Sequence, residues 1–180
     1  MTHPVLEAIR TRRVTRAMTE RAIERPLLEE VLKAGRWTPS AGNRRLHRYV
    51  AVQDALTLRL LRMIAPGMFQ RPAAVVVICI VWQRVDAQGM PRDNKGVYID
   101  VGTAAQTMLL AAHALGLGSG IVTSFSRAGA RVVLNLPEQL SPELLVVLGY
   151  PAPTQPLAIP SRSPVTWQTL TDWERFPARP

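Results

Sequence analysis

Residues 73–82 read AAVVVICIVW, and this stretch decides the fold because it contains no charged residue and almost no polar one. It is too short to cross a membrane, which takes about 18 residues or more, and it is rich in valine and isoleucine, which favour strands. It therefore predicts a central β-strand covered on both faces. Cys79 lies within it, and we expect a buried, inert thiol, because a reactive thiolate needs an accessible, electropositive setting.

Helical and extended patterns alternate around this strand. Apolar residues recur at helical spacing over residues 5–10, 26–37, 56–64, 97–115 and 127–134. Short apolar stretches predict further strands at residues 49–52, 121–124 and 143–148. The polar segment 83–95 indicates a variable surface loop. This order of elements predicts an α+β or α/β domain with a mixed sheet flanked by helices.

The length of 180 residues suits one globular domain. We expect residues 1–150 to form that domain. Residues 151–180 are rich in proline and have little core of their own, so we expect an extension that wraps over a surface, such as that of a partner subunit. The start of the chain lacks a signal-like apolar segment and no membrane span is expected, which favours a cytoplasmic protein.

Arginine dominates the charge of the chain. The sequence holds 20 arginines and two lysines against 13 acidic residues, a net charge of +9. Much of the excess lies in residues 1–48. Three interpretations remain open: a solvated surface, a nucleic-acid-binding face, and a site for a small phosphorylated ligand. Nucleic-acid binding is the weaker of the last two, because the basic N-terminal run lacks interleaved aromatic residues.

No side-chain pattern indicates an activated nucleophile or a metal centre. Ser40 and Ser119 lack the glycine context of a nucleophile elbow, and the acidic residues are scattered. One cysteine and three histidines without ligand spacing do not make a zinc site. The glycines of GLGSG (116–120) follow a helix and precede a strand, the reverse of the dinucleotide-binding order. We therefore expect no catalytic side chain and no metal.

An enzyme with this sequence would take its chemistry from a cofactor. The candidate cofactor-binding segment is TRRVTR at residues 11–16. Arg12 and Arg16 are four residues apart, so they share a face if the first helix continues, and together they could bind one phosphate through forked hydrogen bonds. A solvated surface remains the alternative for such a run.

Together with later segments, this run resembles the nitroreductase-like family of FMN-dependent oxidoreductases. IRTRRVTR (9–16) and then AGRWTPSAGNRRLHRYVAV (34–52) are similar to that family's Arg-Arg-Ser-x-Arg run and Pro-Ser-x-x-Asn loop. Further matches are DVGTAAQTMLLAAHALGLGSG (100–120), VVLGYP (146–151) and the basic residue Arg162. The matches occur in order over nearly the whole chain, so the set is more specific than any one of them.

The resemblance implies an α+β fold and an intertwined homodimer with two FMN molecules at the interface. It implies that the FMN phosphate and ribityl chain are held by Arg12, Arg13, Arg16 and Arg162. The other subunit would line the ring with Pro39, Ser40, Ala41 and Asn43. Residues 121–123, with Val122 and Thr123, would run along the flavin with a backbone N–H facing N5.

The implied reaction is ping-pong. NAD(P)H would give hydride to flavin N5 and leave, and a small oxidised acceptor, such as a nitroaromatic compound or a quinone, would take the electrons. The flavin and water can supply the protons. A flavin-binding relative with another reaction is the alternative: dehalogenation, cleavage of its own flavin, or dehydrogenation. The loop at residues 83–95 and the open space over the flavin would determine which acceptor can bind.

Three cofactor-binding positions depart from the family pattern. Val14 stands where a hydroxyl residue is usual, which removes one polar contact. Thr123 replaces a frequent glycine and crowds the approach to N5. Arg45 replaces a glutamine near the pyrimidine edge, and His47 follows where tryptophan is common. An inward-pointing Arg45 would stabilise anionic reduced flavin; an outward-pointing one would only add surface charge.

Overall fold

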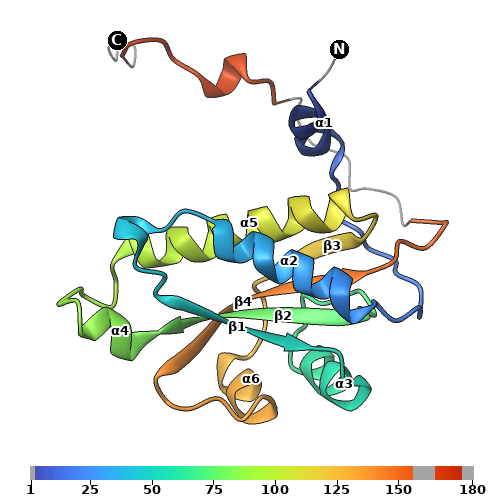
Figure 1. Ribbon diagram of the computed structural model, residues 1–180, viewed down its shortest axis with the longest axis horizontal. Coiled ribbons are helices and arrows are strands. Elements are labelled where there is room, and N and C mark those ends of the chain that lie inside the picture. Colours follow the sequence, from blue (N-terminus) through green and yellow to red (C-terminus); the bar gives the residue numbers. More distant parts are fainter. Residues whose placement is uncertain (1–2, 156–164, 176–180) are drawn as a thin grey trace.

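A computed structural model describes residues 3–155 and 165–175 and contains one four-stranded sheet (Figure 1). The strand order is β1-β2-β4-β3, and each neighbouring pair is antiparallel. The strands are β1 (His47–Val52), β2 (Ala74–Val81), β3 (Gly118–Val122) and β4 (Leu140–Gly149). The chain belongs to the α+β class, as expected. The expected mixture of strand directions is present only as an isolated parallel bridge between Val14 and Ser119, outside the four strands.

Strand β2 lies at the centre of the packing and is buried along its whole length. Val76 and Ile78 pack into the core on one face of the sheet, and Val75 and Val77 into the core on the other. The alternation follows from the period of two in a strand. The prediction of a central strand is confirmed, and Cys79 is fully buried, as expected.

Helices cover both faces of the sheet. One face carries α2 (Arg25–Trp37) and α5 (Lys95–Ala114), and the other carries α3 (Ala55–Met63) and α6 (Arg127–Val133) (Figure 1). The long helix α5 begins at an Asn94 cap, whose side chain accepts a hydrogen bond from the N–H of Gly96, and it ends before Gly116, which has a positive φ of 74°. These bounds agree closely with the predicted helix at residues 97–115.

The remaining helical segments are α1 (Pro4–Thr11), α4 (Trp82–Asp86), η1 (Ala41–Asn43) and η2 (Gln168–Leu170). Helix α1 agrees with the helix predicted at residues 5–10, and it ends at Thr11, so it does not continue through the run from Arg12 to Arg16. The expectation of a loop over residues 83–95 is wrong in part, because α4 continues directly from the end of β2.

Helix α1 and the C-terminal segment leave large apolar side chains exposed. None of the α1 residues is buried, and Val5, Leu6 and Ile9 are each more than half exposed. Trp167 and Trp173 are exposed as well, at 61% and 71%. Figure 1 shows both segments beyond α5, away from the sheet. Within the described residues, no helix is both long and apolar enough to span a membrane.

Candidate functional site

Residues 12–16 run in extended form beside β3. The N–H of Thr15 donates to the carbonyl of Ser119 at 2.9 Å, next to the bridge formed by Val14. A Cβ on Gly118 would lie 2.6 Å from two atoms of the Thr15 side chain, so glycine is required for this close approach. Of the three arginines in this run, Arg12 and Arg13 line a small pocket here, whereas Arg16 does not.

The guanidinium of Arg12 carries a nitrogen that the protein does not satisfy. Its Nη1 is buried and has no hydrogen-bond partner among the described residues. A pocket of about 280 Å³ lies here, lined by Arg12 and Arg13 from one side and by Gly118 and Ser119 from the other. Leaving a buried charged donor unpaired is costly, so the site favours an anion. The residues present therefore fit the phosphate of a bound cofactor.

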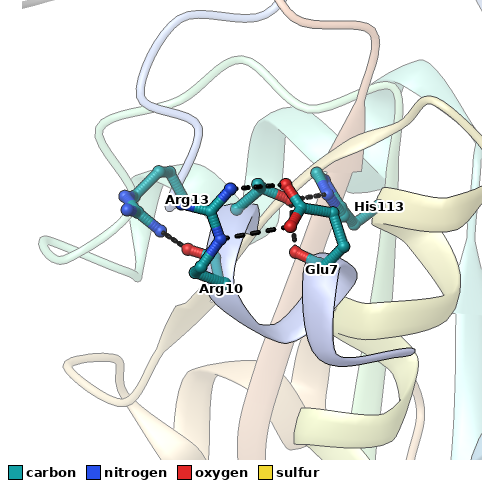
Figure 2. Close-up of polar contacts among 5 residues, drawn as sticks. Glu7, Arg10, Arg13 and His113 are labelled. Carbon is teal, nitrogen blue, oxygen red and sulfur yellow. Dashed lines mark hydrogen bonds and ion pairs between the residues drawn. The ribbon is translucent and has the colours of Figure 1, made fainter. Parts of the chain in front are cut away.

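Arg13 is used differently from Arg12. Its Nη1 donates to the carbonyl of Arg10 at 2.6 Å (Figure 2) and to that of Arg12 at 2.9 Å, and so satisfies acceptors at the end of α1. Beside it, Arg10 pairs with Glu7 at 2.7 Å. In this structure that nitrogen of Arg13 supports the helix end rather than the pocket.

His113 of α5 connects α1 to the body of the protein. The Thr11 hydroxyl donates to the Glu7 carbonyl at 2.7 Å, so the 3.0 Å contact between Thr11 Oγ1 and His113 Nε2 has the histidine as donor (Figure 2). His113 also lines the pocket at Arg12. No spacing pattern in the sequence connects His113 with Thr11.

The segment after β4 is attached to the arginine run. Gln155 Oε1 accepts from the N–H groups of Arg16 and Ala17, both at 3.0 Å, and its Nε2 donates to the carbonyl of Ala17 at 2.7 Å. Residues 151–155 therefore leave the sheet beside the candidate cofactor-binding segment. Arg162, the expected fourth arginine, lies outside the described residues.

Gln70 is a second unsatisfied polar residue at this place, and the sequence analysis missed it. It is 6% exposed, and its Nε2 donates to the carbonyl of Thr15 at 3.1 Å. Its Oε1 is buried without a partner among the described residues. A Cβ on Gly120 would lie 3.3 Å from Nε2, so the amide sits against β3. The available signal was a polar residue placed just before the apolar strand.

The loop at residues 39–45 is held by its own hydrogen bonds and by α5. Ser40 Oγ accepts from the N–H of Arg45 at 3.1 Å. Asn43 and Arg45 have positive φ angles of 55° and 48°. The N–H of Ala41 donates to both oxygens of Asp100, which is 5% exposed. Pro39, Ala41 and Asn43 are exposed, and Ser40 is half-buried.

The expected site residues form two groups in one chain. The loop contacts Asp100 near the start of α5, whereas Thr11, which directly precedes the arginine run, contacts His113 near the end of α5. Thirteen residues of helix separate these contacts, about 20 Å at 1.5 Å per residue, and Figure 1 shows the two groups at opposite ends of α5. Thr123 is exposed at the end of β3, while the Val122 side chain is buried in the core, so Val122 can offer a ligand only its backbone.

Burial shifts the pKa values of several other reactive side chains. Burial raises the pKa of the Cys79 thiol to about 12, which keeps it protonated. Burial raises the pKa of Tyr49 to about 12 and lowers that of His47. In the part of the chain that the structure describes, no cluster of three or more histidine, cysteine or acidic side chains could hold a metal.

The sequence of this chain is similar to proteins of one family. A model described as the nitroreductase family matches residues 9–82 and 61–150. A Methanothermobacter thermautotrophicus protein, provisionally named NADH dehydrogenase/NAD(P)H nitroreductase, is 33% identical over 156 residues, covering 82% of this chain and 78% of that protein. A Thermus thermophilus protein named NADH dehydrogenase is 31% identical over 184 residues, covering 84% and 90%.

A solved structure supports the same relationship. A provisionally named nitroreductase from Desulfovibrio desulfuricans, in complex with FMN, superposes with a TM-score of 0.79. It is 27% identical and covers 98% of this chain and all of its own. A nitroreductase family protein from Clostridium difficile superposes with a TM-score of 0.79 over 97% of this chain. At 24% identity, this match shows that the two proteins share a fold.

Proposed function

Because the chain belongs to the nitroreductase family and is an oxidoreductase, we propose that it binds FMN and transfers electrons from NAD(P)H to a small oxidised acceptor. Bound FMN would supply a ring that takes hydride from the donor and then reduces a nitroaromatic compound, a quinone or a similar acceptor, in two separate half-reactions. The observation that carries this proposal is the buried, unpaired Nη1 of Arg12 in a pocket beside β3.

Arginines from the extended run would bind the phosphate and ribityl chain. Arg12 would donate from the nitrogen that has no partner among the described residues, and Arg16 would join it at the phosphate, because charge-assisted hydrogen bonds to phosphate are strong. Arg13 and, from the C-terminal extension, Arg162 would complete this group. Val14 would contact the chain without a polar group, and Gln70 would offer its unpaired Oε1.

The loop of a second copy would cover the ring, so we propose a homodimer. Pro39, Ser40, Ala41 and Asn43 would line the ring from the partner, with Arg45 near the pyrimidine edge. The backbone of Val122 and Thr123 would run along its other edge. Support comes from the separation of the two groups of residues in one chain and from the exposed apolar side chains of α1 and residues 165–175. Residues 151–180 would then be an extension of the 1–150 domain that clamps the partner.

Side chains would position and shield reactants rather than exchange protons with them. Among the described residues, the polar side chains that line the arginine pocket are arginines, hydroxyls and His113, with no carboxylate. The covering loop would exclude water from the ring, which strengthens electrostatic interactions there.

The test is to purify the protein, record its visible absorption, and identify any cofactor released by denaturation. We expect released FMN, bleaching of its absorption by NADPH or NADH without oxygen, and recovery on addition of a quinone. A colourless protein that does not bind added FMN would contradict the proposal.

A further inference from the structure

A second basic pocket lies at the opposite edge of the sheet from Arg12. Strand β1 forms that edge, whereas β3 and the arginine run lie at the other. The pocket has a volume of about 590 Å³, within the range of small-molecule sites. Its cations come from α2, the loop before β1, β1 and α4: Lys33, Arg36, Arg45, Arg48 and Arg84.

The charges of this pocket are not balanced within the described residues. Lys33 pairs with Glu30 at 2.6 Å. No ion pair forms at Arg36, Arg45, Arg48 or Arg84 in residues 3–155 and 165–175, and no acidic residue lines the pocket. Four guanidinium groups around one hollow repel one another, and each presents a planar set of donors suited to phosphate. This arrangement favours a multiply charged anion.

The wall of the pocket adds an aromatic surface and one unsatisfied acceptor. The Tyr49 hydroxyl donates to the Gly35 carbonyl at 2.9 Å, so His47 Nε2 donates to Tyr49 at 2.8 Å. The pKa of His47 is lowered, chiefly by burial and to a smaller extent by Arg45, while the nearby Asp100 carboxylate acts in the opposite direction. A neutral His47 with its proton on Nε2 leaves Nδ1 as an acceptor, and Nδ1 is buried without a partner among the described residues. An amino group such as that of adenine would match it.

We propose that this pocket binds the adenosine end of NADPH and selects NADPH over NADH through the 2′-phosphate. The inference rests on the proposed function, because Arg45 is both a pocket residue and the end of the loop proposed to cover the partner's ring. The pyrophosphate carries about −2 and the 2′-phosphate up to about −2. Their sum matches the charge of the four pocket arginines that form no ion pair within the described residues.

The kinetic test compares two variants that lose equal charge. Arg36→Gln with Arg48→Gln removes two pocket arginines; Arg59→Gln with Arg62→Gln removes two exposed arginines of α3 on the other face of the sheet. We expect the pocket variant to raise the KM for NADPH about tenfold or more, as lost charge-assisted hydrogen bonds do. The KM for NADH should rise less, so that preference for NADPH falls, with kcat and bound FMN unchanged. Equal effects on both donors, or equal effects in both variants, would overturn the inference.

A binding test separates this inference from the proposed function. Adenosine 2′,5′-bisphosphate, titrated by calorimetry into the full-length protein, should bind the wild type and the α3 variant alike and the pocket variant about tenfold more weakly. No binding to the wild type, or preference of the pocket for a DNA oligonucleotide, would overturn the inference even in an active flavoprotein. Absence of FMN from the protein would contradict the proposed function. The affinity for adenosine 2′,5′-bisphosphate would still test whether the pocket binds the adenosine end of NADPH.

Discussion

The backbone N–H of Ala41 donates to both carboxylate oxygens of Asp100, at 3.1 and 3.2 Å, and thereby joins the loop at residues 39–45 to the start of α5. A buried carboxylate requires donors to offset its lost hydration. Asp100 therefore positions the loop, and through it the side chains proposed to cover the ring.

Asp100→Ala should loosen this loop. The Ala41 N–H would lose its acceptor, which costs about 1–3 kcal/mol when the donor stays out of water, and FMN affinity should fall. Urea unfolding and FMN titration measure the two effects. Asp100→Asn keeps an acceptor oxygen and should retain most of both properties. Wild-type stability and FMN affinity in Asp100→Ala would show that the contact does not position the loop.

Gly118→Ala should disturb the arginine run. The new Cβ would lie 2.6 Å from Thr15 Cγ2 and Oγ1, so the run must move away from β3. We expect a loss of about 1–3 kcal/mol in the free energy of unfolding and weaker FMN binding. Adding Thr15→Gly removes the clash and should recover part of both. If Gly118→Ala alone is neutral, residues 12–16 are not held as closely to β3 as described.

Acid should weaken the contact between the start of α2 and the end of β4. Hydrogen bonds to Glu24 from Tyr150 and then Arg21 lower its pKa from 4.5 to about 2. A lowered folded-state pKa gives stability that is complete above the unfolded-state value and is lost as the pH falls toward about 2. As the pH is lowered from about 4.5 to about 2, the urea concentration at the unfolding midpoint should therefore decrease. It should decrease less steeply in Glu24→Gln. Equal slopes would exclude this contribution.

Local patterns were enough to predict most of the framework. The apolar run at residues 73–82 predicted β2, because burial on both faces removes polar residues from the strand itself. The long helix was equally clear, since its buried residues recur at helical spacing. Hydrophobic patterns do not indicate whether neighbouring strands are parallel or antiparallel. The sequence therefore led to the expectation of a mixed sheet, whereas the four strands are antiparallel.

The site depended on contacts between distant residues. Arg12 and Arg16 would share a helical face only if the first helix continued, but residues 14 and 15 pair with Ser119 and the run is extended. The roles of Gln70 and Asp100 could not be predicted, because each depends on a contact with a residue far away in sequence, Thr15 for Gln70 and Ala41 for Asp100. The roles assigned to the FMN-contacting residues stay predictions from the family resemblance.

Arg45→Gln tests whether this arginine acts on the flavin. A cation about 4 Å from the developing charge is worth about 4 kcal/mol at an effective dielectric of about 20. A quarter of that would raise a two-electron potential by about 20 mV, so Arg45→Gln should lower the midpoint potential measurably in a spectroelectrochemical titration. Arg44→Gln is the matched control, because the Arg44 guanidinium lies on Met90 Sδ at 3.0 Å. An unchanged potential in Arg45→Gln would remove Arg45 from the FMN site.

The central claim is that each flavin is held by the arginine run of one copy and the loop of another. Two defective chains test it: Arg12→Ala with Arg16→Ala in one, and Ser40→Ala with Asn43→Ala in the other. Each variant alone should lose FMN, the first through its phosphate contacts and the second through the loop.

The decisive measurement is the FMN content of the heterodimer of these two variants, purified through two different affinity tags. One of its two sites would combine both defects, and the other would combine the intact halves of the two chains. The account predicts one FMN per heterodimer, while each mutant homodimer holds none. A heterodimer without FMN would contradict it, because every site would then be built from a single chain.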